Sequence, residues 1–445
     1  MTIRTLGALA AGCALTACNA GAGAIAVPAV PSSRVEATAS PIKHVVFIVQ
    51  ENRSFNNLFM GYPGAKTAKY GYDTYGNKLP LQSQVLATIW DIDHSSRAFF
   101  KACDGHGSLP GTHCKMDGWN GEEAGQGHPA NPAYSYVPRD ETAPYWEIAK
   151  QYVLADRTFA SNLDGSFIAH QYIVAAYASR AVDYPLSYWG CEGGATDVIS
   201  TLTDQRTYGS TIRVCFKNPT IASEADRASL TWRFYAGAVN GDGGLWSSYQ
   251  SDRKIYDGPD WKADVISPPA QFLTDVANGS LASVTWITPL FADSDHAGLQ
   301  ASGGPAWVAS LVNAIGTSKF WKNTAIFIMW DDWGGWFDPV KPVYEDYDGL
   351  GFRVPLLIVS PYAKQGYVTH VQYETASVLR YIEDNFGLGQ LAPSDTRARD
   401  PANDAFDYAQ PPRKFHTIAG SRSRAYWIER SRRPPRMPPA IIGDD

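Results

Sequence analysis

The chain has 445 residues, and 44% of them are hydrophobic, which is enough to fill the core of one large α/β domain with insertions or of two domains. A formal net charge of −6 argues against a general nucleic-acid binder, because such proteins are basic. The 14 Trp and 24 Tyr residues suit a densely packed secreted protein or an aromatic-lined cleft for an organic or sugar-bearing ligand.

The first residues are typical of an export signal. A single positive charge precedes an Ala/Leu/Gly-rich stretch that is too short to span a bilayer, and small residues follow it. Leu15–Cys18 resembles a bacterial lipobox, in which the Cys becomes the lipidated first residue. Ordinary cleavage near Ala22 or Ala24 is the alternative. We therefore expect a lipoprotein-type signal peptide at residues 1–18 and a protein exported to the periplasm, outer membrane or cell surface, anchored through Cys18.

Composition divides the rest of the chain. Residues 19–40 are rich in Ala, Gly, Pro and Ser and are expected to form a flexible tether. Residues 41–395 carry the pattern of a folded domain, and residues 396–445 form an extension with a basic, Pro-rich end. We expect that end, from about Ser421, to be disordered, and contact with anionic lipid or lipopolysaccharide is the weaker alternative. No stretch behind the leader is long and apolar enough for a transmembrane helix.

The first expected strand is His44–Gln50, an apolar run that ends in the polar residues Glu51 and Asn52. Such a run, bounded by turn signals, is typical of a strand buried on both faces, as in a parallel sheet. Further along, residues from about 100 to 139 are rich in Gly, His, Pro and Asn, and we expect a long irregular loop over a site there.

Four cysteines follow the leader, and an even number in an exported protein suggests disulfide bonds. Three pairings are possible. Proximity along the chain favours Cys103–Cys114 and Cys191–Cys215, each of which closes a local loop. The chain has no Cys-x-x-Cys spacing, which argues against a zinc site of the finger type.

Ser166 is expected in the first turn of a helix, because Phe167–Ala178 has a helical pattern. At that position, free N–H groups and the positive end of the helix dipole favour an alkoxide and an incoming phosphate. A Ser there is also an ordinary helix cap. His170 lies one turn further along the same face. The absence of a Gly-x-Ser-x-Gly block argues against a Ser-His-Asp lipase.

A second polar cluster follows a later strand. Ala325–Trp330 is apolar and runs directly into Asp331 and Asp332, with Trp and Gly behind them instead of Lys or Arg. In open α/β sheets, ligands bind beyond the carboxyl ends of the strands. Glu51 and Asn52 are therefore expected to meet the two aspartates there, where three carboxylates repel each other unless a cation lies among them. This combination predicts a hard-metal site with oxygen ligands.

The remaining elements complete an α/β pattern. Residues from about Tyr184 to Pro268 carry Cys, Gly and aromatic residues and are expected to be an insertion. The other expected strands are Ser283–Thr288 and Leu356–Ser360, and the other expected helices are Pro144–Leu154, Ala306–Ile315 and Thr375–Phe386. Thr142 suits the start of the first of these helices, and Gly387 suits the end of the last.

Glu51–Phe55 and Trp330–Gly335 resemble the two signature blocks of the bacterial phosphoesterase family, which includes phospholipases C and acid phosphatases. Further blocks match in the family's order: Ser294–His296, Gly303–Val308, Leu311–Ile315, Arg353–Pro355, Val359–Ala363 and Ser377–Glu383. The matches run from about Lys43 to about Leu391. Since the family resembles the alkaline-phosphatase-like superfamily, the resemblance implies a three-layer α/β/α sandwich with a mainly parallel central sheet and loop insertions.

The resemblance also implies roles for individual residues. It makes Ser166 the nucleophile, and His94 and His296 match the family's early and late histidines. We expect His296 to protonate the leaving oxygen. The expected ligands of one divalent metal ion, of unspecified identity, are Glu51, Asn52, Ser166, Asp331 and Asp332. The expected substrate-binding residues are Asn52, His94 and His170, and the two histidines are also expected to take part in catalysis.

The chain departs from the family pattern in two places. Phospholipase-type members more often have Thr-x-Pro-Asn where this chain has Ser166 and, four residues later, His170. Members often have Asp-His-Val where this chain has Asp338, Pro339 and Val340. The first departure leaves the specificity for lipids open, and the second removes a histidine that contributes to the site in relatives or requires another residue to supply its role.

These observations predict an exported, metal-dependent phosphoesterase of the acid phosphatase or phospholipase C type, which hydrolyses phosphate esters through a phosphoserine. A sulfatase-like hydrolase is one alternative, but the residues after Ser166 do not match the Cys/Ser-x-Pro-x-Arg block of sulfatases. A surface-tethered carbohydrate- or ligand-binding protein on the same fold is another alternative. The joint presence of Ser166 and the acids around the expected metal site argues against it.

Overall fold

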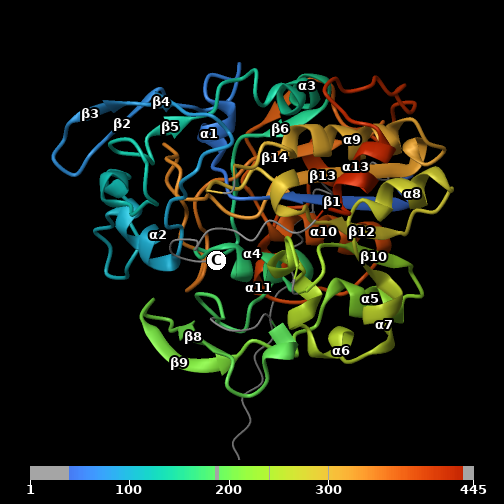
Figure 1. Cartoon of the computed structure of the whole chain (residues 1–445), viewed down its shortest axis with the longest axis horizontal. Coiled ribbons are helices and arrows are strands. Elements are labelled where there is room, and N and C mark those ends of the chain that lie inside the picture. The colour runs from blue at the N-terminus through green and yellow to red at the C-terminus, as the bar shows by residue number, and fades with distance from the viewer. Residues whose placement is uncertain (1–39, 186–189, 240, 299, 434–445) are drawn as a thin grey trace, which may run out of the picture. The chain divides into compact units, whose positions relative to one another are not determined.

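A central sheet of eight strands organises the protein in the computed structural model, which describes residues 40–433 except 186–189, 240 and 299 (Figure 1). The strand order is β11-β10-β12-β1-β13-β14-β6-β15. The strands are β1 His44–Gln50, β6 Val153–Ala155, β10 Trp232–Tyr235, β11 Val265–Ile266, β12 Val284–Ile287, β13 Thr324–Trp330, β14 Leu356–Val359 and β15 Tyr367–Thr369. The apolar runs of β1 and β13 fill the middle of the sheet, where both faces are covered.

Parallel pairing brings the ends of β1 and β13 together. Within the sheet, β11, β10, β12, β1 and β13 pair in parallel with their neighbours, and β14 runs antiparallel to both β13 and β6. Gln50 lies opposite Trp330 in the register of β1 and β13. The residues that follow these two strands therefore leave the same edge of the sheet side by side. The expectation of a mainly parallel central sheet is confirmed.

Helices cover both faces of the sheet. In Figure 1, α3 Ala143–Gln151, α8 Gln271–Ala277, α9 Gly304–Gly316 and α13 Arg424–Arg430 lie above β1, whereas α4 Ser166–Ala175, α5 Ile221–Arg227 and α10 Ala376–Phe386 lie below it. The contacts agree with this division, because α9 packs against α3 and α8, and α4 packs against α5 and α10. The arrangement is the expected α/β/α sandwich. Gly387 ends α10 with a φ of 68°, a conformation that suits glycine.

Smaller elements lie outside the central sheet. The short strands are β2 Tyr70–Tyr72, β3 Lys78–Pro80, β4 Gln82–Ser83, β5 Ser135–Tyr136, β7 Thr158–Phe159, β8 Val198–Leu202, β9 Tyr208–Arg213 and β16 Tyr373–Glu374. The short helices are α1 Phe55–Phe59, α2 Ser96–Cys103, α6 Arg253–Tyr256, α7 Pro259–Asp264, α11 Pro393–Arg397 and α12 Ala402–Ala405. Single 3-10 turns include η3 Gly244–Trp246 and η5 Phe291–Asp293.

Two expectations about these elements are wrong. The helix expected at Pro144–Leu154 ends at Gln151, and the apolar run that follows forms β6, because it pairs with β14 on one side and β15 on the other. The segment Tyr184–Pro268 is not wholly an insertion. It supplies β10 and β11 of the central sheet, since β10 pairs in parallel with β12, and its β8–β9 hairpin lies outside that sheet. Aromatic residues in β10 had concealed the strand pattern.

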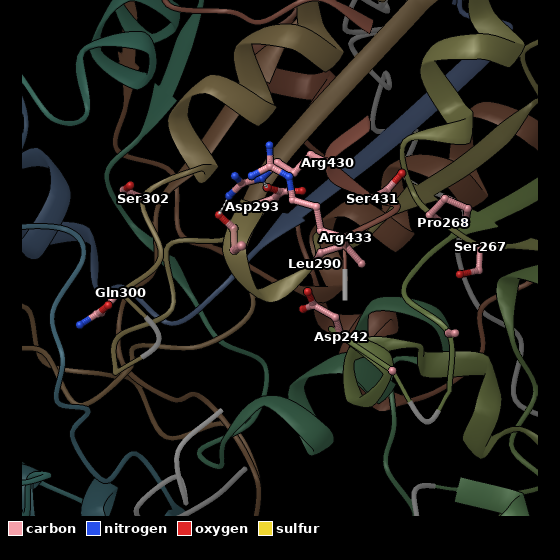
Figure 2. Close-up of a pocket in the computed structure, with 13 residues that line it drawn as sticks. Asp242, Ser267, Pro268, Leu290, Asp293, Gln300, Ser302, Arg430, Ser431 and Arg433 are labelled. Carbon is pink, nitrogen blue, oxygen red and sulfur yellow. Dashed lines mark hydrogen bonds and ion pairs between the residues drawn. The ribbon is translucent and has the colours of Figure 1, made fainter. Parts of the chain in front are cut away.

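A cavity of about 470 Å³ opens at the carboxyl ends of β10, β11 and β12 (Figure 2). Its lining is mixed polar and apolar and comprises Ala238, Gly241, Asp242, Ser267, Pro268, Leu290, Ala292, Asp293, Gln300, Ser302, Arg430, Ser431 and Arg433. Arg430 of α13 donates to the carboxylate of Asp293 and, at 2.7 Å, to the carbonyl of Ala292. Burial raises the pKa of Asp293 to about 6, although Arg430 opposes that rise. Arg430 thus connects α13 to the segment that follows β12, at the wall of the cavity.

The C-terminal extension folds against the sandwich as far as it is described. In α13, Trp427 is 1% exposed and packs on Trp307 of α9, with 5.0 Å between the ring centroids. The expectation of a disordered end from Ser421 therefore does not hold for Arg424–Arg430. The leader, Cys18 and the tether lie outside the described residues. Among the residues that are described, no helix is long and apolar enough to cross a bilayer.

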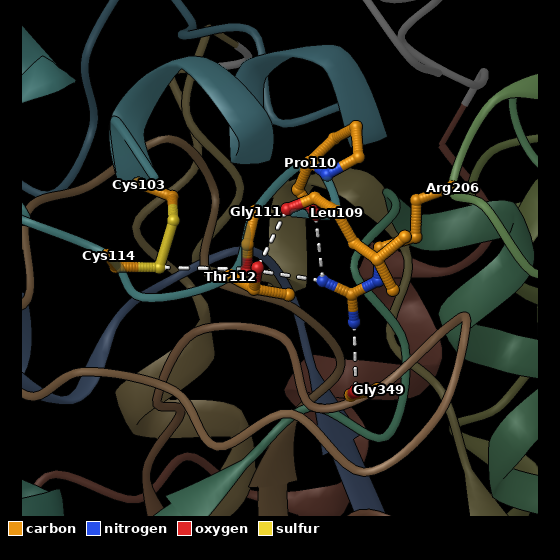
Figure 3. The surroundings of a disulfide bond; sticks show 8 residues. All are labelled: Cys103, Leu109, Pro110, Gly111, Thr112, Cys114, Arg206 and Gly349. Carbon is orange, nitrogen blue, oxygen red and sulfur yellow. Dashed lines mark hydrogen bonds between the residues drawn. A yellow bond between two sulfur atoms is a disulfide. The ribbon is translucent and has the colours of Figure 1, made fainter. Parts of the chain in front are cut away.

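Both expected disulfide bonds are present, Cys103–Cys114 and Cys191–Cys215. The first closes a loop that Arg206, from the turn between β8 and β9, holds in place (Figure 3). Arg206 is 2% exposed and donates to five backbone carbonyls at 2.9–3.2 Å. Two of these carbonyls belong to the disulfide loop and three to the segment 346–349. One buried guanidinium therefore connects three segments that are far apart in the chain.

Replacing Arg206 with Met should lower the free energy of unfolding by roughly 3 kcal/mol, because several carbonyl groups lose their donor while an unbranched side chain still fills part of the space. Urea unfolding followed by Trp fluorescence measures the change. Arg227→Met is a suitable control, because Arg227 is 62% exposed and pairs with Glu224 at the surface of α5. That variant should change the free energy by less than about 0.5 kcal/mol. Equal changes in the two variants would contradict the role assigned to Arg206.

Candidate functional site

Four polar residues meet where β1 and β13 end. The backbone N–H of Asn52 donates to Asp331 Oδ1 at 3.1 Å, and the N–H of Asp331 donates to the carbonyl of Gln50 at 3.0 Å. Asn52 has a φ of 53°, and Gly334 packs so closely that a Cβ atom there would lie 2.1 Å from the carbonyl oxygen of Asn52. Glu51, Asn52, Asp331 and Asp332 each expose 1% or less of their surface. The residues expected from the sequence are thus gathered in one buried cluster.

Ser166 enters this cluster as the first residue of α4. Its Oγ lies 3.2 Å from Asn52 Oδ1 and 3.4 Å from carboxylate oxygens of both Glu51 and Asp332. The first N–H groups of a helix have no intrahelical acceptor, so the start of α4 presents donors and a positive dipole end at this point. The hydroxyl group therefore lies where carboxylates can accept its hydrogen and where helix N–H groups can bind an anion.

His170 faces the same cluster from one turn further along α4. Its Nε2 lies 3.0 Å from Glu51 Oε1 and 3.7 Å from Asp331 Oδ2. One ligand atom from each of Glu51, His170 and Asp331 lies within 4.8 Å of the others. Ligands of a single ion at about 2.0–2.6 Å lie no more than about 5 Å apart, so the three residues can hold one metal ion. The sequence assigned His170 to substrate binding and catalysis, and the structure adds that its Nε2 lies beside two of the expected metal ligands.

The donor set fits a divalent cation. Asp331 Oδ2 is buried and has no hydrogen-bond partner among the described residues. Three carboxylates lie in the cluster, and carboxylates this close together and out of water repel each other. The sequence predicted ligands that are all oxygen atoms. A set of oxygen ligands with one imidazole, as seen here, suits metals such as Mn²⁺ or Zn²⁺. The geometry thus supports a metal centre and shifts its ligand set towards His170.

His94 reaches the cluster from the segment between β4 and α2. Its Nδ1 lies 2.7 Å from the carbonyl of Ile92, so Nδ1 carries the hydrogen. Its Nε2 lies 2.5 Å from Asn52 Nδ2 and 3.8 Å from Asp332 Oδ2. Asn52 consequently bridges Ser166 and His94 through the two ends of one amide group.

His296 lies beside His94, with 6.1 Å between the two ring centroids. Its Nδ1 lies 2.6 Å from the carbonyl of Ala297, and its ring stacks on Trp246 at a centroid distance of 5.9 Å. It follows η5, behind the end of β12, which is the strand expected at Ser283–Thr288. The cavity beside β12 is lined by residues on either side of His296 in the chain, but none of the eight candidate site residues lines it.

Asp164 is a residue that the sequence reasoning missed. Its carboxylate accepts hydrogen bonds from the backbone N–H groups of Ser96, Gly165 and Asp183 at 2.8–3.1 Å. Burial, followed by the charge of Asp183, raises its pKa to about 7. Asp164 thereby fixes the chain as it enters α4 at Ser166. Its position two residues before the candidate nucleophile was the signal available in the sequence.

Comparisons with known proteins identify the family to which the chain belongs. A family model described as the Phosphoesterase family matches residues 42–389. Phospholipase C B of Mycobacterium tuberculosis (strain CDC 1551 / Oshkosh) is 24% identical over 433 residues, which cover 83% of this chain and 78% of that protein. Non-hemolytic phospholipase C of Burkholderia pseudomallei (strain K96243) is 23% identical over 80% of this chain and 57% of its own length. A solved protein of the alkaline phosphatase superfamily from Vibrio parahaemolyticus matches with a TM-score of 0.38 and 12% identity over 80% of this chain and 70% of its own, too distant a likeness to carry an argument.

Replacing Glu51 with Gln should weaken the binding of a divalent cation at least ~10-fold, because the substitution removes one of the charges that attract the ion. Calorimetric titration of the metal-free protein with Mn²⁺ and with Zn²⁺ measures the affinity without any substrate. Glu383→Gln is a matched control, since Glu383 is a fully buried acid on α10 whose neighbour is Asp395. Unchanged affinity in the Glu51 variant would show that Glu51 does not hold the ion, and the absence of binding by the unmodified protein would show that the cluster holds none.

Proposed function

Because the chain belongs to the phosphoesterase family and is a hydrolase of phosphoric ester bonds, we propose that it works with one divalent metal ion and a phosphoserine intermediate at Ser166. The contact that supports this proposal most is that of Ser166 Oγ with Asn52, Glu51 and Asp332 at 3.2–3.4 Å, at the start of α4. A serine that merely capped the helix would not need to face buried acids. The substrates are phosphate esters of the kind that acid phosphatases or phospholipases C hydrolyse.

The metal ion would be held by Glu51, His170 and Asp331, with Asn52, Asp332 and Ser166 Oγ next to them. When bound, such an ion acts as a Lewis acid on phosphoryl oxygens and lowers the pKa of a nearby hydroxyl group. The buried Asp331 Oδ2, which has no hydrogen-bond partner among the described residues, supports this assignment. Nucleophilic attack, proton transfer and binding of the phosphoryl group are assigned to side chains of the protein.

In the first half of the reaction, Ser166 Oγ attacks phosphorus in line with the leaving oxygen. Its hydrogen passes to the carboxylate of Glu51 or of Asp332, each of which has an oxygen 3.4 Å from Ser166 Oγ. The new Oγ–phosphorus bond forms as the ester oxygen–phosphorus bond breaks, and His296 gives a proton to the departing alkoxide. Water then attacks the phosphoserine, which releases phosphate and restores the hydroxyl group.

Asn52 is the proposed donor to the phosphoryl oxygens, through its side-chain N–H, and His94 orients that amide group. The side-chain amide of Asn52 contacts both Ser166 Oγ and His94 Nε2, so it lies between the nucleophile and the histidine. Donors that are already fixed in a buried site stabilise developing negative charge without reorganising during the reaction. The N–H groups at the start of α4 add further donors at the same point.

Export is the second part of the proposal. The two disulfide bonds, Cys103–Cys114 and Cys191–Cys215, support an oxidising compartment such as the periplasm or the cell surface. A lipid anchor at Cys18 would place the enzyme at a membrane. The arginines near the end of the chain are a second candidate for membrane contact.

Changing Cys18 to Ala should release the protein from the membrane fraction of expressing cells, because the acylated residue is lost. Fractionation followed by immunoblotting measures the distribution. Cys13→Ala is the matched control and should leave the protein membrane-bound. If the Cys18 variant stays in the membrane fraction, the anchor is an uncleaved leader or the basic tail.

Ser166→Ala should reduce turnover of p-nitrophenyl phosphate and p-nitrophenyl phosphorylcholine by about 10³-fold or more, because the nucleophile is lost. A chelator should abolish turnover by the unmodified enzyme, and rapid quenching of that enzyme should trap phosphate on Ser166, which mass spectrometry detects. Ser423→Ala is the matched control, since Ser423 is a cap that accepts from the N–H of Tyr426 at the start of α13. Retention of most activity in the Ser166 variant would mean that water attacks the ester directly.

A further inference from the structure

Three segments of the candidate site are joined by residues that are each adjacent in the chain to a candidate site residue. Asp295 precedes His296, Trp330 precedes Asp331, and Arg53 follows Asn52. Asp295 contacts both of the other two. None of these three residues belongs to the set expected to carry the chemistry. All three are fully buried, at 0% exposure.

The carboxylate of Asp295 is the centre of this network. Its Oδ2 accepts hydrogen bonds from Trp330 Nε1 at 3.0 Å and from the hydroxyl of Tyr145 at 2.8 Å. Tyr145 comes from α3, and its ring meets that of Trp330 edge to face at a centroid distance of 4.9 Å. The backbone carbonyl of Asp295 accepts from Arg53 Nε at 2.8 Å. One residue thus connects the ends of β1 and β13 with the segment that carries His296.

The second carboxylate oxygen of Asp295 faces the start of α9. A Cβ atom at Gly304 would lie 2.1 Å from Asp295 Oδ1, so this position requires glycine. Among the described residues, Oδ1 has no hydrogen-bond partner. The positive end of the helix dipole favours a carboxylate at this place. Burial raises the pKa of Asp295 to about 6, and the hydrogen bond from Tyr145 opposes that rise most.

Arg53 fixes the other side of the network. Its Nη2 donates to the carbonyl of Leu86 at 2.7 Å, Nη1 donates to Asn57 Oδ1 at 3.3 Å, and the guanidinium lies over Trp336 at 4.6 Å. Burial lowers its pKa to about 10, so the side chain stays charged at neutral pH. Arg53 therefore gives the carbonyl of Asp295 a rigid, charged donor.

We propose that Asp295 is a positioning residue, which sets the place of His296 relative to Asn52 and Asp331 without touching the substrate. The proposal rests on the function proposed above, in which His296 protonates the leaving oxygen. A proton donor must lie within hydrogen-bond reach of the oxygen it protonates, so a small displacement of its backbone costs rate. Asp295 links its own segment to the end of β13 through its carboxylate and to the end of β1 through its backbone carbonyl.

The substitution Asp295→Asn tests this role while it keeps the shape of the side chain. An amide has a single oxygen, so its NH₂ group must face either the two donors on Tyr145 and Trp330 or the start of α9. The carboxylate's arrangement cannot be reproduced in either orientation. Tyr145→Phe is a second variant, which removes one hydrogen bond and keeps the buried ring. It replaces Asp295→Asn in the test if that variant does not fold.

The activity measurement compares two monoesters. Glycerol phosphate has a poor leaving group that needs a proton, whereas p-nitrophenolate leaves unaided. His296→Ala supplies the reference pattern, a loss of kcat/KM that is at least ~10-fold larger for glycerol phosphate than for p-nitrophenyl phosphate. Asp295→Asn should give the same selective loss, Tyr145→Phe should give a smaller loss of the same kind, and Glu383→Gln should give none. In the double variant of Asp295 and His296, the selective loss should not exceed that of His296→Ala alone.

A purely structural role gives a different pattern. Equal losses on both esters, or selective losses that add in the double variant, would overturn the proposal. A second measurement does not depend on activity. In protein labelled with ¹⁵N-histidine, the imidazole signals of His296, assigned by their absence from His296→Ala, should shift in Asp295→Asn, while those of the exposed His370 should not.

The two measurements separate the two proposals. If the unmodified protein hydrolyses no phosphate ester, the proposed function fails, and the imidazole signals still report whether Asp295 positions His296. If those signals are the same in Asp295→Asn and in the unmodified protein, the positioning role fails whatever the activity. Shifted signals together with a selective loss on glycerol phosphate support both.

Discussion

The register between β1 and β13 is the constraint on which the candidate site depends. The strands run in parallel with Gln50 opposite Trp330, so Glu51 and Asp331 leave the sheet at the same level. A slip by one residue would turn every following side chain to the other face of the sheet, and the carboxylates would no longer meet. The apolar run Val45–Val49, buried along its whole length, holds the register by packing on both faces.

Asp338 shows how this protein treats a buried carboxylate that it neutralises itself. Arg353 donates to it from Nε and Nη2 at 3.0–3.1 Å, and the N–H of Asn56 donates at 3.0 Å. Burial raises the pKa of Asp338, and the charge of Arg353 opposes that rise. Members of the family often have Asp-His-Val at residues 338–340. In this chain, Asp338 forms a buried ion pair with Arg353. The acids at the ends of β1 and β13 instead lie among histidines, in an arrangement that could hold a cation.

The parts of the chain that looked peripheral also support the site. Trp427 of α13 packs on Trp307 of α9, and the first residue of α9, Gly304, lies against Asp295. The C-terminal extension therefore reaches the segment of His296 through a single helix. The large-scale packing and the local chemistry are coupled because the interior is close-packed, so a shift of one element is felt by its neighbours.

The sequence by itself determined the features that depend on local pattern. Long apolar runs identified β1 and β13, the polar residues behind them indicated the site, and proximity along the chain gave both disulfide bonds. Only the tertiary structure showed which further side chains join these residues. In the structure, His170 lies next to Glu51 and Asp331, and β10 and β11 belong to the central sheet. It also revealed the contacts of Asp295, because a hydrogen bond between residues 150 positions apart leaves no periodic trace in a sequence.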